Sequence, residues 1–153
     1  MLSDPEVSRY LPRGPFASAD VPAISRRVID HFISHWQRHH FGTWAVVDQS
    51  SGAFVGQAGL NRLQEAPEVE VLYALAKPWW GRGLASEAAR AAVGFGFDEA
   101  RLERIVGLTL PGNVASERVL ANAGLHYEKD ATFFGMRVRY FALDRAARVA
   151  DSH

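Results

Sequence analysis

The sequence predicts an α/β (α+β) fold in which helices flank a mixed, mostly antiparallel central sheet. Three observations support this prediction. Two helical segments come first, strand-like segments joined by short turns follow, and strands then alternate with helices. The chain has 153 residues, of which 48% are hydrophobic and 22% are charged. This length and composition are those of one globular domain, so we expect a single domain over residues 1–153.

Charge and cysteine content exclude several classes of protein. Lys and Arg total 17 and Asp and Glu total 17, so the formal net charge is zero. A neutral chain cannot hold a nucleic acid or an anionic membrane through its overall charge. Arg supplies all but two of the cations, which allows local sites that bind anions. The chain has no cysteine, which excludes thiolate zinc sites and a cysteine nucleophile. With no apolar segment of membrane-spanning length, we expect a cytoplasmic protein without a membrane or nucleic-acid partner.

Two helices are expected before the first strand. Ser3-Asp4-Pro5-Glu6 is typical of a helix start, because a capping side chain, a proline and an acid occur in order. This helix must be short, since it is followed by the helix breakers Pro12, Gly14 and Pro15. Ser18 or Asp20 then opens a longer helix that reaches about His39. The apolar face of this helix contains Ile24, Val28, Phe32 and Trp36.

A hairpin and a central strand follow. Thr43–Asp48 and Ala53–Leu63 have strand-like composition, and Gln49–Gly52 between them is a turn. Glu65-Ala66-Pro67 forms the next turn. Glu70–Ala76 is more apolar than simple alternation requires, so we place it in the middle of the sheet.

The second half of the chain alternates helices and strands. An Ala-rich helix is expected from Arg82 to about Ala100, although Gly94 and Gly96 inside it should each cost about 1 kcal/mol relative to Ala. The remaining predicted elements are a strand at Arg104–Leu110, a helix at Asn113–Ala123 closed by Gly124, a short strand beginning at Leu125–Glu128, and one long final strand at Thr132–Leu143.

The segment Trp80-Gly81-Arg82-Gly83-Leu84-Ala85-Ser86-Glu87 joins a buried strand to the Ala-rich helix. Glycines in such a segment let backbone N–H groups turn toward one point, and the helix N-terminus adds partial positive charge, so the segment suits a phosphate group. Arg82 could add a full charge. The alternative is a plain Gly-rich turn. The pattern is neither a P-loop nor a dinucleotide fingerprint, because the required Gly-Lys-Ser/Thr and glycine spacing are missing.

A second polar motif, Asn113-Val114-Ala115-Ser116, opens the following helix. Asn113 also fits a plain N-cap, and Ser116 fits a solvated or back-bonding hydroxyl in the first turn. The order of the two motifs favours a functional reading. A phosphate cradle, a helix, a strand, Asn-x-x-Ser and a helix closed by Gly occur in sequence.

With these motifs the chain resembles the GNAT superfamily of N-acetyltransferases, in particular its RimJ/RimL-like branch. The resemblance covers most of the chain and includes Asp4-Pro5-Glu6-Val7, Tyr73-Ala74-Leu75, Trp80-Gly81-Arg82-Gly83-Leu84-Ala85, Arg104–Leu110, Asn113–Ser116 and Gly124-Leu125. It implies a GNAT-like sheet with a splay between its two central strands. Asp4–Val7 aligns after the usual opening strand of the family, so we expect that strand to be missing. Its loss would expose the edge of the Thr43–Asp48 strand and favour a homodimer.

The resemblance also implies acetyl-CoA as co-substrate and no metal. The pyrophosphate would lie on the amides of Gly81, Arg82, Gly83, Leu84, Ala85 and Ser86. The pantetheine arm would lie in the splay, paired with backbone around Leu75 and Ala76. Asn113 would contact the pantetheine arm, and Ser116 would lie near the sulfur.

Two catalytic residues are expected from the resemblance. Glu70 corresponds to a frequent family glutamate and would act as the base that accepts the proton of the amine. Its alternative is an exposed acid at the end of a strand. Many superfamily members carry a tyrosine acid at the position of Leu120, and Ser116 is the available substitute here. A backbone N–H near Leu75 would polarise the thioester carbonyl.

The acceptor is expected to be a primary amine, on a protein N-terminus or a small molecule. A non-catalytic acyl-CoA-binding or regulatory domain is the alternative. His31, His35 and His39 recur every four residues on the second helix and could line the acceptor groove, titrate near neutral pH or bind a metal. More often, histidines in such a pattern are partly buried and satisfied by hydrogen bonds, or lie at a dimer contact, so we expect no metal here.

Overall fold

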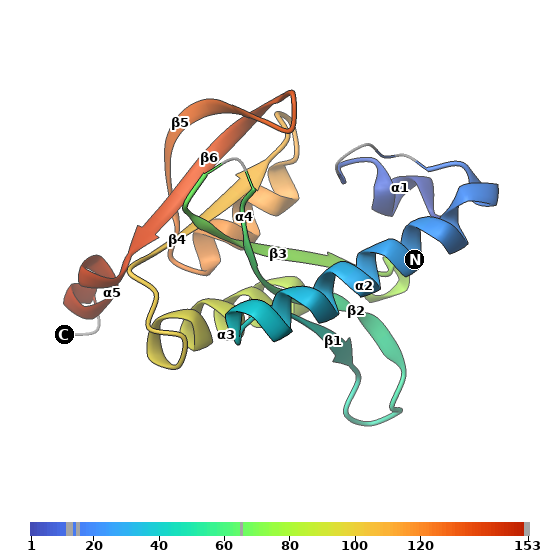
Figure 1. Cartoon of the computed structure of the whole chain (residues 1–153), viewed down its shortest axis with the longest axis horizontal. Helices are drawn as coiled ribbons and strands as arrows, with labels where there is room; N and C mark the ends of the chain where they lie inside the picture. The colour runs from blue at the N-terminus through green and yellow to red at the C-terminus, as the bar shows by residue number, and fades with distance from the viewer. Residues whose placement is uncertain (12–13, 15, 65, 152–153) are drawn as a thin grey trace.

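The structure is a computed structural model that describes the chain except for residues 12–13, 15, 65 and 152–153. In chain order its elements are α1 (Pro5–Ser8), a 3-10 turn (Ser18–Asp20), α2 (Val21–His39), β1 (Thr43–Val47), β2 (Phe54–Arg62), β3 (Val69–Leu75), a 3-10 turn (Lys77–Trp79), α3 (Leu84–Asp98), β4 (Arg104–Thr109), α4 (Val114–Asn122), β5 (His126–Phe133), β6 (Met136–Asp144) and α5 (Arg145–Asp151). Figure 1 shows α1 and α5 at opposite ends of the molecule.

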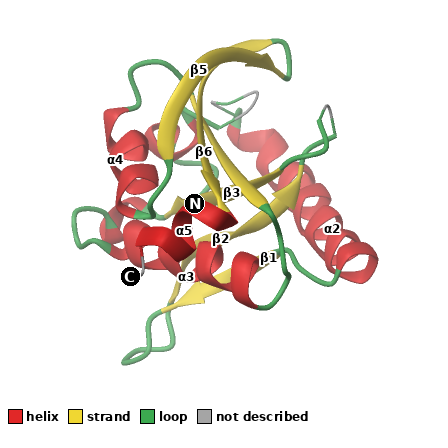
Figure 2. Ribbon diagram, turned by 90° about the vertical axis from the view of Figure 1, so that its left-hand side faces the viewer, coloured by secondary structure: helices red, strands yellow, loops and turns green. Residues whose placement is uncertain are grey.

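The described strands form one six-stranded sheet in the order β1-β2-β3-β4-β6-β5. Every neighbouring pair is antiparallel except β3 and β4, which are parallel. Helix α2 lies on one face of the sheet, and α3 and α4 lie on the other (Figure 2). The predicted fold class is therefore confirmed, including the interior place of the 70–76 strand.

The parallel pair β3 and β4 separates almost as soon as it forms. Only Val69 with Ile105 and Glu70 with Val106 are in register. Beyond these two pairs the strands part, which confirms the expected splay between the central strands. The gap opens toward the C-terminal ends of both strands, beside the beginnings of α3 and α4.

The helical N-terminal region follows the sequence prediction. The Asp4 side chain accepts a hydrogen bond from the Glu6 N–H at 2.9 Å and caps α1. The expected breakers Pro12 and Pro15 lie outside the described residues. Helix α2 ends at His40, which adopts a left-handed conformation with φ of 60°. Its predicted apolar face is half-buried against the sheet.

The core between α3 and the sheet depends on small residues. Ala89 and Ala92 of α3 are 0% and 1% exposed, and they pack in one cluster with Leu60 and Ile105. A Cβ atom on Gly96 would lie 2.7 Å from the Cδ1 atom of Ile105, closer than van der Waals contact allows. Gly96 is thus a packing requirement rather than a weakness of the helix.

The C-terminal prediction was wrong in two respects. The expected long strand Thr132–Leu143 is interrupted at Phe134 and Gly135, which have φ of 55° and 70° and form the turn between β5 and β6. Two consecutive left-handed residues are typical of the tight turns that join hairpin strands. Helix α5 was also not predicted, because its short sequence has no clear apolar period.

Strand β1 forms one edge of the sheet in the described part of the chain. Val47 on this strand and Phe54 on β2 are each more than half exposed. Among the residues that the structure places, no helix has the length and apolar character needed to cross a bilayer.

Two glycines of α3 should respond in opposite directions to the same substitution. Gly94→Ala should raise the free energy of unfolding by up to about 1 kcal/mol, because Ala favours helix and the new Cβ meets only Arg148 Nη2, at 3.7 Å. Gly96→Ala should lower it by about 1–3 kcal/mol, because the core is already full there. Urea unfolding of both variants measures the difference. Equal effects would contradict the packing described for Gly96.

Candidate active site

An open cavity of about 1200 Å³ runs from α1 and α2 through the splay to the beginnings of α3 and α4. It brings together most of the residues that the sequence singled out. Those lining it are Glu70, Leu75, Gly81, Gly83, Leu84, Ala85, Ser86, Asn113 and Ser116. Ala76 and Arg82 do not line it. The predicted site residues between positions 70 and 116 therefore meet at one place. They come from β3, the turn before α3, α3 itself and the start of α4.

The Gly-rich turn forms one end of the cavity. Gly81 and Gly83 have φ of 74° and 75°, a left-handed conformation that residues other than glycine rarely adopt. Gly83 is the N-cap of α3 and provides no side-chain cap. The first intrahelical bond joins the Glu87 N–H to the Gly83 carbonyl at 3.0 Å, so the N–H groups of residues 84–86 have no acceptor within the helix. This end of the cavity suits an anion.

Arg82 and Ala76 are engaged elsewhere. The Arg82 guanidinium lies over the ring of Trp79, 5.0 Å from its centroid. The Ala76 N–H donates to the Val55 carbonyl at 2.8 Å, and the Ala76 carbonyl accepts from the Trp79 N–H at 3.0 Å. In an antiparallel ladder alternate residues point to opposite neighbours, so the backbone groups of Leu75 and Tyr73 face the splay instead. The expected backbone contact therefore belongs to Leu75 and Tyr73, not to Ala76.

A buried hydroxyl lacks a partner on the wall of the splay. Thr109 at the end of β4 is 4% exposed and lines the cavity. Its Oγ1 atom has no hydrogen-bond partner among the described residues. Because an unpaired buried hydroxyl is unfavourable, a polar ligand group in the splay would satisfy it.

Helix α4 presents a hydroxyl pair to the cavity. Asn113 acts as the predicted N-cap, since its Oδ1 accepts the Ser116 N–H at 3.2 Å. The Ser116 Oγ and Tyr73 Oη atoms are 2.7 Å apart, and the Tyr73 hydroxyl also lies 3.0 Å from the Ser116 carbonyl oxygen, where it can donate. Burial raises the pKa of Tyr73 to about 12. Tyr73 therefore stays protonated and anchors Ser116 beside the splay.

Glu70 lies on the other face of β3. Its alternative interpretation as an exposed acid is wrong, because the side chain is partly buried and burial raises its pKa to about 7. The Asn61 amide donates to Glu70 Oε1 at 3.2 Å and lowers the pKa in part. Asn61 is the direct cross-strand neighbour of Glu70 on β2. A carboxyl group that titrates near neutral pH in a cavity is suited to proton transfer.

The two faces of β3 thus carry different chemistry. Glu70 and Asn61 belong to the face that α2 covers, whereas Tyr73 hydrogen-bonds to Ser116 on α4, across the other face. Because residues three apart on a strand point to opposite faces, only the splay joins the two groups into one cavity. A proton acceptor on one side and a hydroxyl donor from the Tyr73–Ser116 pair on the other can then act on one substrate.

The three histidines of α2 have separate environments. His31 Nε2 lies 2.9 Å from the Asn61 Oδ1 atom. His35 Nδ1 donates to the Phe41 carbonyl at 2.8 Å, and its Nε2 accepts the Arg62 N–H at 2.9 Å. His35 is therefore neutral, and burial lowers its pKa. Within the described residues no group of three or more His, Asp or Glu side chains is arranged to hold a metal ion.

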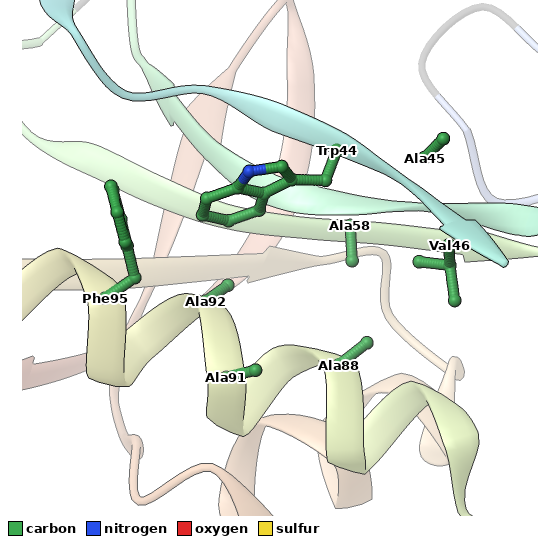
Figure 3. Close-up of a pocket in the computed structure, with 8 residues that line it drawn as sticks. All are labelled: Trp44, Ala45, Val46, Ala58, Ala88, Ala91, Ala92 and Phe95. Atoms are coloured by element: carbon green, nitrogen blue, oxygen red, sulfur yellow. The ribbon is translucent and has the colours of Figure 1, made fainter. Parts of the chain in front are cut away.

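A smaller pocket of about 390 Å³ lies between α3 and strands β1 and β2. Figure 3 shows Ala88, Ala91 and Ala92 of α3 below β1, with Trp44 and Phe95 at one end. All of its lining residues are Ala, Val, Phe or Trp. It contains no acid or base, so the chemistry belongs to the larger cavity.

The sequence did not predict that the side chains of Asn61, Tyr73 and Thr109 belong to the site. Asn61 stands in a strand with no motif around it, and its position opposite Glu70 comes from the register of β2 and β3. Tyr73 was recognised only as part of a family motif. Thr109 lies inside the predicted strand Arg104–Leu110 and is the last residue of β4, and only its buried hydroxyl, unpaired among the described residues, marks it.

Comparison with known proteins gives a consistent result. The family model described as "Acetyltransferase (GNAT) domain" matches residues 1–126. The chain is 39% identical over 88 residues to the uncharacterized protein YkkB of Bacillus subtilis, covering 56% of this chain and 51% of that protein. It is 29% identical over 129 residues to the uncharacterized N-acetyltransferase p20 of Bacillus licheniformis, covering 84% and 70%. The chain thus spans about half the length of the first relative.

The fold is also similar to that of a solved structure. The crystal structure of an acetyltransferase from Agrobacterium tumefaciens str. C58 superposes with a TM-score of 0.80 at 24% identity. The match covers 93% of this chain and 80% of the other.

Replacing the buried acid should stabilise the protein at alkaline pH. Below pH 4.5 Glu70 is protonated in both the folded and the unfolded chain, whereas above about pH 7 the folded state must bury its charge. We expect Glu70→Gln to raise the free energy of unfolding by up to about 3 kcal/mol at pH 8 and by little at pH 4. Chemical denaturation at the two pH values measures this. The exposed control Glu103→Gln should change stability by less than about 0.5 kcal/mol at both.

Proposed function

The chain belongs to the GNAT acetyltransferase family, and from this premise we propose that it is an N-acetyltransferase that transfers an acetyl group from acetyl-CoA to a primary amine. The acceptor would be a protein N-terminus or a small amine. We also propose that the chain belongs to the RimJ/RimL-like branch, supported by the Trp80–Ala85 motif. A single domain, a homodimer and a cytoplasmic location stay predictions.

The observation that carries this proposal is the continuity of the Gly81–Ser86 turn with the splay. The turn presents unbonded N–H groups at one end of the cavity, and the splay presents the unpaired Thr109 hydroxyl and the backbone of Leu75 at its middle. A long ligand with an anionic end and an amide-containing arm fits this order of groups. Acetyl-CoA has that form, and when bound it supplies the acetyl group as a thioester.

Each binding role follows from the geometry of these groups. The N–H groups of residues 81–86 would hold the pyrophosphate. The backbone of Leu75 and Tyr73 and the Thr109 hydroxyl would bind the amides of the arm, in place of the Ala76 contact that the sequence suggested. The Leu75 carbonyl already accepts the Trp80 indole N–H at 2.8 Å, so the Leu75 N–H is the group left to polarise the thioester carbonyl.

Glu70 would act as the base. The amine nitrogen forms a bond to the carbonyl carbon, the carbon–sulfur bond breaks, and one proton leaves the nitrogen for the Glu70 carboxylate. With a pKa of about 7, about half of the Glu70 side chains are ionised at pH 7 and most are ionised at pH 8. An alkyl amine has a pKa of about 10, so only its neutral fraction attacks. The nitrogen becomes positively charged as its lone pair forms the new bond, and this makes the proton that Glu70 accepts more acidic.

Ser116 and Tyr73 would stabilise the leaving thiolate. A thiol has a pKa of about 8.5, well below the value of about 12 for Tyr73, so complete proton transfer from Tyr73 is unfavourable by about 5 kcal/mol. The Ser116 hydroxyl would therefore donate a hydrogen bond to the sulfur, and Tyr73 would hold it in place. Leu120 leaves no tyrosine on α4 to perform this role.

Binding of acetyl-CoA should be measurable as thermal stabilisation. At a concentration of 100 times Kd, acetyl-CoA should add about 2.7 kcal/mol and raise Tm by roughly 5–10 °C. Gly83→Glu should abolish the shift, because it places a carboxylate where the pyrophosphate would bind. Gly52→Glu is the matched control, since Gly52 has a similar φ of 72° in a turn outside the cavity. No shift for the unaltered chain at millimolar acetyl-CoA would contradict the proposal.

Turnover should depend on Glu70 and on pH. We expect CoA thiol release with a panel of N-terminal peptides, polyamines and amino sugars, and kcat/KM should rise with pH through about 7 as Glu70 ionises. Glu70→Gln should lower kcat by 10²- to 10⁴-fold while leaving the thermal shift with acetyl-CoA intact. Binding without turnover for every acceptor would instead favour the alternative, a non-catalytic acyl-CoA-binding domain.

A further inference from the structure

Three side chains from three elements are joined by a continuous series of hydrogen bonds that ends at Glu70. His31 on α2 lies 2.9 Å from Asn61 on β2, and Asn61 lies 3.2 Å from Glu70 on β3. All three line the large cavity and are partly buried. Helix α2 is therefore connected to Glu70 through one intermediate residue, Asn61.

The chemistry of the three groups fixes the direction of the hydrogen bonds. An ionised carboxylate only accepts, so the Asn61 Nδ2 group must donate to Glu70 Oε1. The Asn61 Oδ1 atom then faces His31 and accepts, which requires that His31 Nε2 carries a hydrogen. His35, one turn further along α2, has the opposite arrangement, with its hydrogen on Nδ1. The hydrogen that makes the contact is therefore on Nε2 in His31 and on Nδ1 in His35.

This arrangement leaves one oxygen of Glu70 for the substrate. Oε1 is held by Asn61 in either protonation state of the carboxyl group, so a proton from the amine would be received at Oε2. If the Asn61 amide rotated, its oxygen would face the carboxylate and repel it. The hydrogen on His31 Nε2 opposes that rotation, because the rotated amide would present its own N–H₂ group to it.

Two ionisable groups beside the hydrogen-bonded series His31–Asn61–Glu70 have partners of their own. Arg62 on β2 donates to the Pro67 carbonyl, and Glu68 before β3 accepts from the Tyr140 hydroxyl of β6. The neighbour of Glu70 on β4 is the apolar residue Val106. The other ionisable side chains that line the cavity are Glu6, Arg9, Tyr10, Arg27, Tyr73 and Arg118. Burial and the Asn61 hydrogen bond are the causes that set the Glu70 pKa.

We propose that His31 is a positioning residue that holds Glu70 ready to accept a proton, through the orientation of the Asn61 amide. This inference rests on the proposed role of Glu70 as the base. It assigns a role to the first of the three histidines of α2, and it makes this helix, which lines the cavity, part of the proton-transfer apparatus.

The test compares His31→Leu, which removes the N–H donor, with His31→Gln, which retains one. His39→Leu is the matched control, because His39 lies two turns away on the same helix and does not line the cavity. The Glu70 carboxyl is titrated by ¹³C NMR in the chain alone, with Glu70→Gln identifying the signal. The pH profile of kcat/KM is then measured with the acceptor of the panel that releases thiol fastest.

In His31→Leu we expect the titration midpoint of the Glu70 carboxyl group to rise by about 0.5 to 1 pH unit. The reason is that the hydrogen bond from Asn61, which favours the carboxylate, weakens. The acidic limb of the rate profile should move with it, so that kcat/KM at pH 7 falls about threefold and recovers near pH 9. His31→Gln and His39→Leu should resemble the unaltered chain, and the thermal shift with acetyl-CoA should persist in all variants.

An unchanged Glu70 midpoint in His31→Leu would overturn the proposal, as would a His31→Gln variant with the same defect as His31→Leu. A midpoint that moves while the rate profile stays fixed would support the positioning of Glu70 by His31 and overturn the role of Glu70 as base. The two proposals therefore fail in different measurements.

Discussion

The early separation of β3 and β4 is the constraint on which the rest of the structure depends. A parallel pair normally continues along both strands, but here two register pairs are followed by divergence. The backbone groups of Tyr73 and Leu75 that would otherwise bond to β4 are left facing a gap. Because the gap passes through the sheet, groups on opposite faces of β3 line one cavity. Without it, Glu70 and Tyr73 would be isolated from each other.

Burial suits Glu70 to proton transfer, but it also lowers the stability of the folded chain. Placing Glu70 among protein atoms raises its pKa to about 7, which suits proton transfer near neutral pH and destabilises the folded chain when the group ionises. The Thr109 hydroxyl, buried without a partner among the described residues, is unfavourable in the same way. Among the described residues, unpaired buried oxygen atoms also occur outside the cavity, on Thr43 and Glu68, whereas both ring nitrogens of His35 are bonded. Glu70 and Thr109 are the two of these groups that line the cavity, where a substrate would relieve them.

Much of this arrangement could be predicted from local sequence. The Gly81-Arg82-Gly83 turn before an Ala-rich helix, and Asn113 before the next helix, placed both motifs correctly because glycine conformation and helix capping are local properties. The break between β5 and β6 could not be predicted in this way, since Phe134-Gly135 lacks the usual Asn-Gly or Asp-Gly signal. Arg82 was expected at the phosphate site, but the ring of Trp79 beside it offers a competing contact.

The sequence by itself determined the order of elements as far as β6, the fold class and the two motifs that line the cavity, because helix periodicity, turn residues and caps act over a few neighbouring positions. Only the tertiary structure decided which side chains meet. Asn61 contacts Glu70 because of the strand register, and His31 reaches Asn61 because α2 covers that face of the sheet. Tyr73 and Ser116 are 43 positions apart and meet only where α4 packs beside the splay. Contacts of this kind depend on packing between distant segments, which no local pattern specifies.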